Sequence, residues 1–404
     1  MSKTDWIVVG AGSAGCIVAA QLANATDSRR GMVTLVEPPT KTAPQIDRER
    51  PAHWLKLLNS SEDWNLATRE NEQLARRVLH WPRGKGLGGS SRINAMIWFP
   101  PTRKDLQMLV NASGGAWSVA EMQQDFQNLT LLTRPEQPAW QSESTHRFLN
   151  AAKQLDEGTA WTYLRLNRSG RRWNPAELCN TAQANGSIEV QRTTVNRLIC
   201  KGDRVIGVET WDDRGKNEIL ANKGVIICAG AIATPAILMR SGIGPRDHLK
   251  KTGIEVRVES EHVGHGLQDH LIMPMIFQVR SGQFPSRSSV QDIARWQTMG
   301  TGPLASNLAE CGGLFLQDSI QIHVTPTHYL NYPKPTDHAF MTIGVNATQP
   351  QSTGVLQLKS SDPRVPLSIQ PHYLQNTRDH NVTIDGMRLA RRLVEETDLF
   401  KESE

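Results

Sequence analysis

The feature that most constrains this 404-residue chain lies near its N-terminus, where an apolar run enters a glycine-rich turn. Residues 5–9 have the length and apolar character of a buried strand, and they lead into Gly10-Ala11-Gly12-Ser13-Ala14-Gly15. A small-residue helical pattern follows over 16–25, and a second apolar run over 32–36 ends in Glu37. Strand, G-x-G-x-x-G turn, helix and second strand in this order predict a βαβ unit that binds a dinucleotide.

Each glycine of the turn has a separate predicted role. Gly10 permits the tight turn, Gly12 lets the backbone approach a pyrophosphate, and Gly15 lets the helix pack closely on the strand. The helix N-terminus offers free N–H groups and a partial positive charge to the phosphates. Glu37 lies where a carboxylate accepts hydrogen bonds from ribose hydroxyls, and because it would repel a 2′-phosphate, NADP is disfavoured. The turn alone leaves FAD and NAD open as ligands.

The composition bounds the class of protein. Apolar residues make up 38% of the chain and charged residues 21%, which is typical of a globular protein, and the length fits two large domains or three smaller ones. The net charge of +5 is spread over the chain, so a nucleic-acid or polybasic membrane surface is not expected. The sequence shows neither a secretory signal nor a run of 18 apolar residues. Five cysteines without a C-x-x-C pair predict buried thiols, no metal site and a cytoplasmic location.

Two further segments carry information. Between Trp81 and Trp98, four glycines in six positions stand among cations and hydroxyls. Because glycine weakens helix and strand interiors, the backbone there is expected to approach a ligand closely. The apolar residues that follow, over 93–98, have helix-like content. Farther along, residues 225–230 predict a buried parallel strand, and Thr234-Pro235 predicts the start of the next helix.

Together the three segments resemble the glucose-methanol-choline (GMC) family of FAD-dependent oxidoreductases. Residues 84–107 are similar to the first family signature and residues 230–244 to the second. Smaller similarities extend over nearly the whole chain, at Trp64, Gly115-Ala116-Trp117-Ser118, 263–270 and 352–363. The resemblance implies an α/β fold, α+β overall, in which a Rossmann-like FAD-binding domain is interleaved with a substrate domain that contains an antiparallel sheet.

The resemblance also implies a division of the chain. Residues 1–100 and 185–262 are expected to form a discontinuous FAD-binding domain, and 101–184 and 263–375 the substrate-binding domain. Residues 376–404 are expected to form a helix that leads towards an absent C-terminal segment. Alternating patterns at 320–324 and 355–358 predict strands of the substrate domain.

In the family, the loop that matches Gly88 to Ser91 runs along the pyrophosphate and the flavin. The segment that begins at Asn94 faces the isoalloxazine ring. Backbone N–H groups of this segment would tune the electronic properties of the ring. Some relatives attach the flavin through a histidine at the position of Ile93, so non-covalent FAD is expected here. Val195 matches a valine that contacts the adenine, although an isolated valine is as readily explained as core. The expected FAD-binding residues are Gly10, Gly12, Ser13, Ala14, Gly15, Glu37, Trp64, Arg83, Gly84, Leu87, Gly88, Gly89, Ser90, Asn94, Ala95, Met96, Ile97, Val195, Ala229, Gly230 and Thr234.

The activity that the resemblance implies is hydride transfer from a primary alcohol, choline-like or other, to flavin N5, with an unidentified electron acceptor. The family places its catalytic histidine in an H-x-x-G-[ST] context, and none of the 12 histidines has that context, so no catalytic residue is assigned. Help from a general base contributes about 10²- to 10⁴-fold. A truncated, catalytically impaired homologue that at most binds FAD is therefore the alternative.

Two questions stay open at the level of sequence. An NAD-binding Rossmann protein unrelated to flavins would explain Gly10 to Glu37 but would leave both later signatures unexplained. The wall of the substrate pocket is uncertain, because aromatic and charged residues in such a domain often pack or solvate instead. The candidates for that wall are Trp98, Glu310, His323 and Tyr329.

Overall fold

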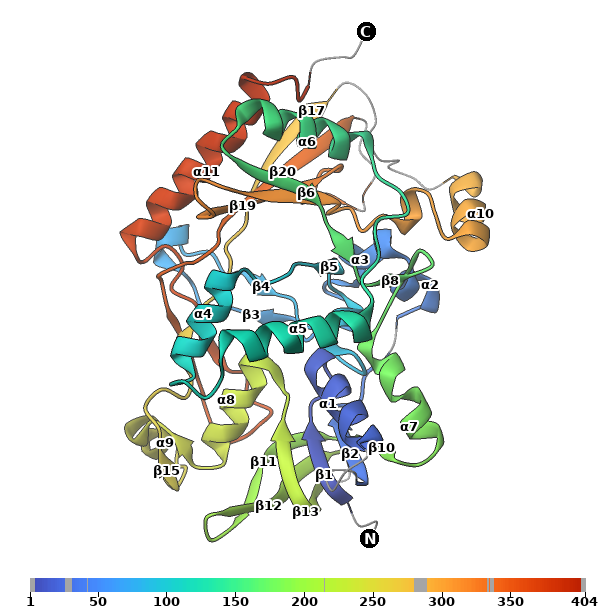
Figure 1. Cartoon of the computed structure of the whole chain (residues 1–404). Coiled ribbons are helices and arrows are strands. Elements are labelled where there is room, and N and C mark those ends of the chain that lie inside the picture. The colour runs from blue at the N-terminus through green and yellow to red at the C-terminus, as the bar shows by residue number, and fades with distance from the viewer. Residues whose placement is uncertain are drawn as a thin grey trace.

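The computed structural model describes residues 4–25, 31–41, 43–213, 215–279, 289–332, 334 and 338–400. It contains a six-stranded sheet towards one end of the molecule and a five-stranded sheet towards the other, with shorter elements between them (Figure 1). The helices are α1 Ser13–Asn24, α2 Gln45–Glu49, α3 Trp54–Leu57, α4 Arg103–Ala112, α5 Val119–Thr133, α6 Glu143–Leu155, α7 Asn180–Ala184, α8 Gly230–Arg240, α9 Arg246–Lys251, α10 Val290–Met299 and α11 Thr377–Glu395.

The strands follow in chain order. They are β1 Thr4–Val9, β2 Val33–Glu37, β3 Leu66–Ala67, β4 His80–Trp81, β5 Ile97–Trp98, β6 Gly158–Thr162, β7 Leu164–Arg165, β8 Asn167–Arg168, β9 Arg171–Arg172, β10 Ile188–Arg192, β11 Thr194–Lys201, β12 Arg204–Asp212, β13 Gly215–Ile227, β14 Ile243–Gly244, β15 Val258–Glu259, β16 His265–Leu267, β17 Met273–Val279, β18 Cys311–Phe315, β19 Ile320–Thr325, β20 Ala339–Ala347, β21 Gly354–Gln357 and β22 Ser368–Gln370.

The six-stranded sheet has the order β10-β2-β1-β13-β12-β11. Its first four strands pair in parallel, and the first half of β13 turns away to form an antiparallel ladder with β12, which in turn pairs with β11. Strand β2 is buried along its whole length because apolar clusters cover both faces of the sheet. This burial on both faces explains the continuous apolar runs of β1 and β2.

The predicted βαβ unit is confirmed as β1, α1 and β2, with β1 and β2 parallel neighbours. Helix α1 turns Ala19, Ala20 and Ala23 towards the sheet, and all three are buried. Such small side chains let the helix axis approach the strands closely. The N-terminus of α1 is consequently held at the carboxyl end of β1, where a ligand of a parallel sheet binds.

The five-stranded sheet has the order β17-β20-β19-β18-β6, and all its pairs are antiparallel. Helices α6 and α11 cover one face and bury Phe148, Ile322 and Leu389 in a common core (Figure 1). The strands predicted at 320–324 and 355–358 are confirmed as β19 and β21.

Two local predictions were wrong. Residues 93–98 do not form a helix; a 3₁₀ turn over Gly89–Arg92 leads to the short strand β5, and Met96 between them has a left-handed φ of 59°, which no α-helix accommodates. Helix α8 begins at Gly230, four residues before the predicted start. Pro235 is tolerated inside it because the carbonyl that loses its N–H partner belongs to Ala231, which is exposed.

The cysteines agree in part with the prediction of buried thiols. All five cysteines are free thiols, and three of them, Cys16, Cys179 and Cys311, are buried. Among the residues that the structure describes, no helix is long and apolar enough to cross a membrane and no cluster of ligating side chains could hold a metal ion. The predicted domain boundaries stay a prediction.

Candidate functional site

The first part of the site is the turn between β1 and α1. Gly10 has a φ of 93°, and a Cβ there would lie 2.7 Å from the carbonyl oxygen of Cys228. A Cβ at Gly15 would collide with the carbonyl oxygen of Gly10. Gly12 differs from both, because a Cβ there would meet no atom within 4 Å. Its φ of −71° suits any residue, so the backbone conformation does not require a glycine here. The open space in front of Gly12 is therefore a candidate site for a ligand.

The helix that follows this turn is uncapped. Gly12 is its N-cap residue and makes no side-chain capping bond, and no acidic residue lies in the first turn. Ser13 and Ala14 are exposed. Free N–H groups and the positive end of a helix dipole therefore face open space, which is the arrangement that binds phosphate.

The second glycine-rich segment lies directly against the first. The N–H of Gly88 donates to the carbonyl of Ala11 at 2.7 Å, and a Cβ at Gly89 would lie 2.7 Å from the Cα of Gly12. Gly88 has a φ of 101°, and a side chain there would collide with Asn174. The two backbones thus approach closely only because both carry glycine.

One buried carboxylate joins the two segments. Glu37, at the end of β2, accepts the N–H of Ala11 at 2.7 Å on one oxygen and the N–H of Gly86 at 2.8 Å on the other. Its side chain is 5% exposed, and burial raises its pKa although both N–H groups act in the opposite direction. Glu37 therefore organises the protein itself; its predicted contact with ribose hydroxyls stays a prediction.

Comparison with known proteins identifies the architecture. The family model described as GMC oxidoreductase matches in two parts, the N-terminal part over residues 4–272 and the C-terminal part over residues 350–404. This chain is a GMC oxidoreductase. The NAD-binding alternative is set aside, and the cofactor of this GMC oxidoreductase is FAD.

Two curated relatives are each less than a third identical to this oxidoreductase in sequence. An uncharacterized GMC-type oxidoreductase of Mycobacterium tuberculosis is 29% identical over 98% of this chain and 81% of its own. Human mitochondrial choline dehydrogenase is 28% identical over 97% of this chain and 72% of its own. Among solved structures, pyridoxine 4-oxidase from Mesorbium loti superimposes with a TM-score of 0.80 at 24% identity, over 98% of this chain and 81% of its own. The last comparison supports the fold.

The residues of this GMC oxidoreductase fit FAD. The open space in front of Gly12 and the uncapped start of α1 suit a pyrophosphate. Ser90 and Asn94, on the neighbouring segment, are exposed, as Ser13 and Ala14 are. Residues 91–93, which lie between Ser90 and Asn94, are buried. Gly230 follows Ala229, whose Cα packs against Gly10, and Gly230 also has open space where a Cβ would lie. The three segments meet at one place, as expected for a shared cofactor.

The segment predicted to face the isoalloxazine is held in an unusual conformation. Met96 is 1% exposed and has a φ of 59°. Its N–H donates to Oδ1 of Asn94 at 3.1 Å, and its carbonyl accepts the N–H of Leu166 at 2.9 Å. A left-handed non-glycine residue costs roughly 1–3 kcal/mol and persists only where its surroundings fix it. Ala95 is fixed as well, since its carbonyl accepts Nδ2 of Asn307 at 2.6 Å.

A buried arginine that the sequence did not single out supports this segment. Arg172 is 8% exposed, and its Nη1 donates to the carbonyl of Ser91 at 3.0 Å, to the carbonyl of Asn94 at 2.8 Å and to Oδ1 of Asn94 at 2.9 Å. Burial lowers the pKa of Arg172 to about 9, with Arg92 acting in the same direction and Glu62 opposing them. At neutral pH the guanidinium is charged, so its hydrogen bonds to the segment are charge-assisted.

Other predicted FAD residues lie around the same loops. Trp64 is 41% exposed, and Nζ of Lys85 lies over its ring, 4.9 Å from the ring centroid. A Cβ at Gly84 would collide with the carbonyl oxygen of Gly89, which again explains a glycine. Leu87, Ile97, Ala229 and Thr234 are half-buried. Val195 is 7% exposed and packs in the core against β1 and α8, so its contact with adenine stays a prediction.

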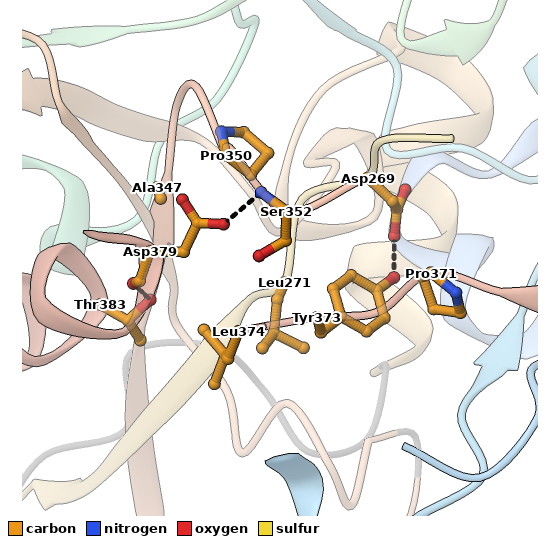
Figure 2. A pocket seen from close by; sticks show the side chains of 10 residues that line it. All are labelled: Asp269, Leu271, Ala347, Pro350, Ser352, Pro371, Tyr373, Leu374, Asp379 and Thr383. Carbon is orange, nitrogen blue, oxygen red and sulfur yellow. Dashed lines mark hydrogen bonds between the residues drawn. The ribbon is translucent and has the colours of Figure 1, made fainter. Parts of the chain in front are cut away.

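Arg83 leads from these loops to a pocket that the sequence did not predict. Its Nη2 lies 4.0 Å from Oδ1 of Asp269, and Oδ2 of the same carboxylate accepts a hydrogen bond from the hydroxyl of Tyr373. Figure 2 shows Asp269 with Tyr373 on one side of the pocket and Asp379 with Ser352 on the other. The pocket is small, with a cavity volume of about 20 Å³. Both carboxylates already have partners: Asp269 accepts the hydroxyl of Tyr373, and Asp379 accepts two backbone N–H groups. We therefore assign the pocket a structural role.

Of the candidates for the substrate-pocket wall, Glu310 was wrong. Glu310 is fully buried, and its carboxylate accepts the N–H and hydroxyl of Ser142 at 2.7 and 2.8 Å, together with the hydroxyls of Thr145 and Ser306. These bonds fasten the start of α6 to the residues before β18. Because four donors already occupy its oxygens, this carboxylate cannot also bind a substrate cation.

Proposed function

We propose that this GMC oxidoreductase oxidises the CH–OH group of a primary alcohol. The observation that carries the proposal is the convergence of the β1–α1 turn, the Gly84–Asn94 loop and the Ala229–Gly230 turn, which leave open space in front of Gly12 and Gly230, as a bound FAD requires. Human choline dehydrogenase, at 28% identity, is named for a substrate that is itself a primary alcohol. Bound FAD would supply the acceptor for the hydride that leaves the alcohol carbon.

The chain's own residues would bind and orient the reactants. The N–H groups at the start of α1 would hold the pyrophosphate, and Glu37 would keep the two phosphate-side loops together. Arg172 and Asn307 would fix the Asn94–Met96 backbone, so that its N–H groups point in a constant direction. Constant geometry at a reacting centre is a large source of rate enhancement, since a misplacement of about 1 Å costs about 10²-fold.

The flavin is proposed to be non-covalent. Ile93, at the position where some relatives carry an attaching histidine, is apolar and 2% exposed. Acid precipitation of the yellow protein should therefore leave the flavin colour in the supernatant. Colour retained in the pellet would show a covalent bond. A cytoplasmic location is likewise proposed, with the five free thiols as its support.

Turnover is tested with a panel of primary alcohols and an artificial electron acceptor such as a redox dye. We expect dye reduction that depends on both FAD and the alcohol, whichever natural acceptor the enzyme uses. A protein that takes up FAD but reduces no dye with any alcohol of the panel would contradict the proposal. It would support the alternative, a GMC homologue that only binds FAD.

A further inference from the structure

A buried positive charge lies behind the segment that is predicted to face the flavin. Arg172 is 8% exposed, and its guanidinium donates to uncharged oxygens, which are Oδ1 of Asn94 and the carbonyl oxygens of Ser91, Asn94 and Arg48. Its Nη2 is buried and has no hydrogen-bond partner among the residues that the structure describes. Neither a hydrogen bond nor an ion pair joins Arg172 to a carboxylate in that part of the chain.

The nearby anion, Glu62, is already shared by other cations. Glu62 opposes the lowering of the Arg172 pKa, but its own Oε1 lies 2.7 Å from Nη2 of Arg92 and 3.5 Å from Nε of Arg48. Its Oε2 accepts Nε of Arg92 at 3.1 Å. Arg48 is partly exposed, so water screens its charge. The buried part of the cluster still holds two cations, Arg92 and Arg172, against the one anion of Glu62.

This excess charge lies under the backbone that leads away from the pyrophosphate space. The 3₁₀ turn Gly89–Arg92 begins against Gly12, and two residues beyond the turn Asn94 is exposed. The N–H of Ala95 donates to no residue that the structure describes. The next element, β5, lies between the two large sheets (Figure 1). A flavin that extends from the pyrophosphate along this segment has a free N–H group in front of it and the charge of Arg172 behind that backbone.

Hydride uptake changes the charge of a flavin ring. A hydride carries two electrons and one proton, so a neutral oxidised ring that accepts it gains one negative charge. The alcohol carbon loses that hydride as the CH–OH group becomes a carbonyl, and the hydroxyl proton is released to solvent. A fixed positive charge in a low-dielectric site stabilises an anion that develops near it and needs no reorganisation to do so. An arginine suits this role, because a guanidinium stays charged at neutral pH even when it is buried.

We propose that Arg172 raises the reduction potential of the bound FAD, because its buried charge stabilises the negative charge that the flavin gains on reduction. The proposal goes beyond the proposed function, in which Arg172 fixes the backbone, and it rests on FAD binding along this segment but on no particular alcohol. A purely structural role would weaken the binding of oxidised and reduced FAD equally and would leave the potential of the bound flavin unchanged. A role of the charge weakens the binding of reduced FAD more, so the potential follows the charge of the side chain.

The test is the midpoint potential of the bound flavin at pH 7, measured by slow anaerobic reduction of the FAD-loaded protein against a reference dye. In Arg172→Met the equilibrium constant for reduction should fall at least about tenfold, which corresponds to about 30 mV for a two-electron couple. Arg172→Lys keeps the charge but loses the planar fork, so it should bind FAD more weakly and yet stay within about threefold of the wild-type equilibrium constant. Because the dye experiment uses no alcohol, failure of the proposed oxidation and failure of this proposal are distinguishable.

A change of opposite sign separates charge from local distortion. Glu62→Gln keeps the shape of the side chain and removes the anion of the cluster, so the equilibrium constant for reduction should rise. Arg171→Met is the matched control, since Arg171 pairs with Glu49 instead, and its potential should equal that of wild type. If Arg172→Met retains no FAD, the lysine and glutamine variants decide. An unchanged potential in Arg172→Met, equal falls in Arg172→Met and Arg172→Lys, or a fall in Glu62→Gln would each overturn the proposal.

Discussion

Arg172 donates to Asn94 twice, through one nitrogen that reaches the backbone carbonyl at 2.8 Å and the side-chain Oδ1 at 2.9 Å. The same Oδ1 accepts the N–H of Met96, so the arginine holds the left-handed turn through the asparagine. The two residues are 78 positions apart in sequence. The backbone predicted to face the flavin is therefore shaped from the neighbouring β8–β9 hairpin.

Replacement of this arginine should weaken FAD binding. In Arg172→Ala, hydrogen bonds to a charged group worth about 1.5–3 kcal/mol are lost, and we expect the dissociation constant of FAD to rise at least about tenfold. The measurement is a fluorescence titration of the apoprotein with FAD. Arg171→Ala is the matched control, since its guanidinium contacts Glu49 and Trp296 instead of the loop. Equal effects of the two substitutions would show that Arg172 has no special role.

Two alanine substitutions in the first glycine turn should have different consequences. In Gly12→Ala the new methyl group enters open space, so the apoprotein should keep its melting temperature while the dissociation constant of FAD rises at least about tenfold. In Gly15→Ala the methyl group collides with the carbonyl of Gly10, and stability should fall by about 1–3 kcal/mol. Melting temperatures and FAD titrations of both proteins separate these effects. Normal FAD binding by Gly12→Ala would contradict the assignment of the open space to the pyrophosphate.

Two histidines with lowered pKa values should make the folded protein less stable in acid. Burial lowers the pKa values of His53 and His323 to about 4. At His53, the charges of Lys56 and Arg50 lower the pKa further, and Asp47 raises it. At His323, His270 lowers the pKa further. In the unfolded chain a histidine has a pKa of about 6.5.

Between these values the unfolded state binds more protons than the folded state. The stabilisation is present above about pH 6.5 and is lost as the pH falls towards 4, by about 1.4 kcal/mol per pH unit for each histidine. Urea unfolding measured from pH 7 to pH 4 checks this slope. His323→Gln should reduce the slope, and the exposed His380→Gln should leave it unchanged. A wild-type stability that is constant over this range would be inconsistent with the two lowered pKa values.

Arg165 should be replaceable without loss of stability. It is 1% exposed, and none of its three side-chain nitrogens has a hydrogen-bond partner in the ranges that the structure describes. Burial lowers its pKa to about 10, so it stays charged at neutral pH, with Glu310 favouring the charge. A buried guanidinium without hydrogen-bond partners bears a desolvation cost of several kcal/mol that a methionine of similar size does not have.

We therefore expect Arg165→Met to melt at the same temperature as wild type or higher. Glu310→Ala should melt at a lower temperature, because it leaves the Ser142 N–H and three hydroxyls without their acceptor. Differential scanning calorimetry of the three proteins decides between these outcomes. Arg165→Met that is as unstable as Glu310→Ala would show that the guanidinium stabilises the fold through contacts with water or Glu310.

The glycine turn was predictable because its requirements are local. Gly12 faces open space and Gly15 lies against the carbonyl oxygen of Gly10 in the same βαβ unit, and the left-handed φ of Gly10 belongs to the turn itself, so the spacing of the three glycines indicates the structure. The strands β19 and β21 were predictable for the same reason, since alternation is a property of neighbouring residues.

The supporting residues were not predictable from sequence. Asn307 reaches Ala95 across 212 positions, and nothing in its neighbourhood distinguishes it from a surface asparagine. Glu310 looked like a free carboxylate because three of its four donors belong to Ser142 and Thr145, 168 and 165 positions away in sequence. The left-handed conformation of Met96 was likewise not predictable, because its apolar neighbours favour a helix. Tertiary hydrogen bonds override that preference.

The most direct test of the proposed function is anaerobic reduction of the bound flavin. The FAD-loaded protein is mixed with a primary alcohol in a sealed cuvette, and the visible absorbance of oxidised flavin is followed. The account predicts bleaching with one equivalent of aldehyde formed per flavin, and slower bleaching when the alcohol carries deuterium at the reacting carbon. Bound flavin that stays oxidised with every primary alcohol tested, including aromatic alcohols and choline, would contradict it.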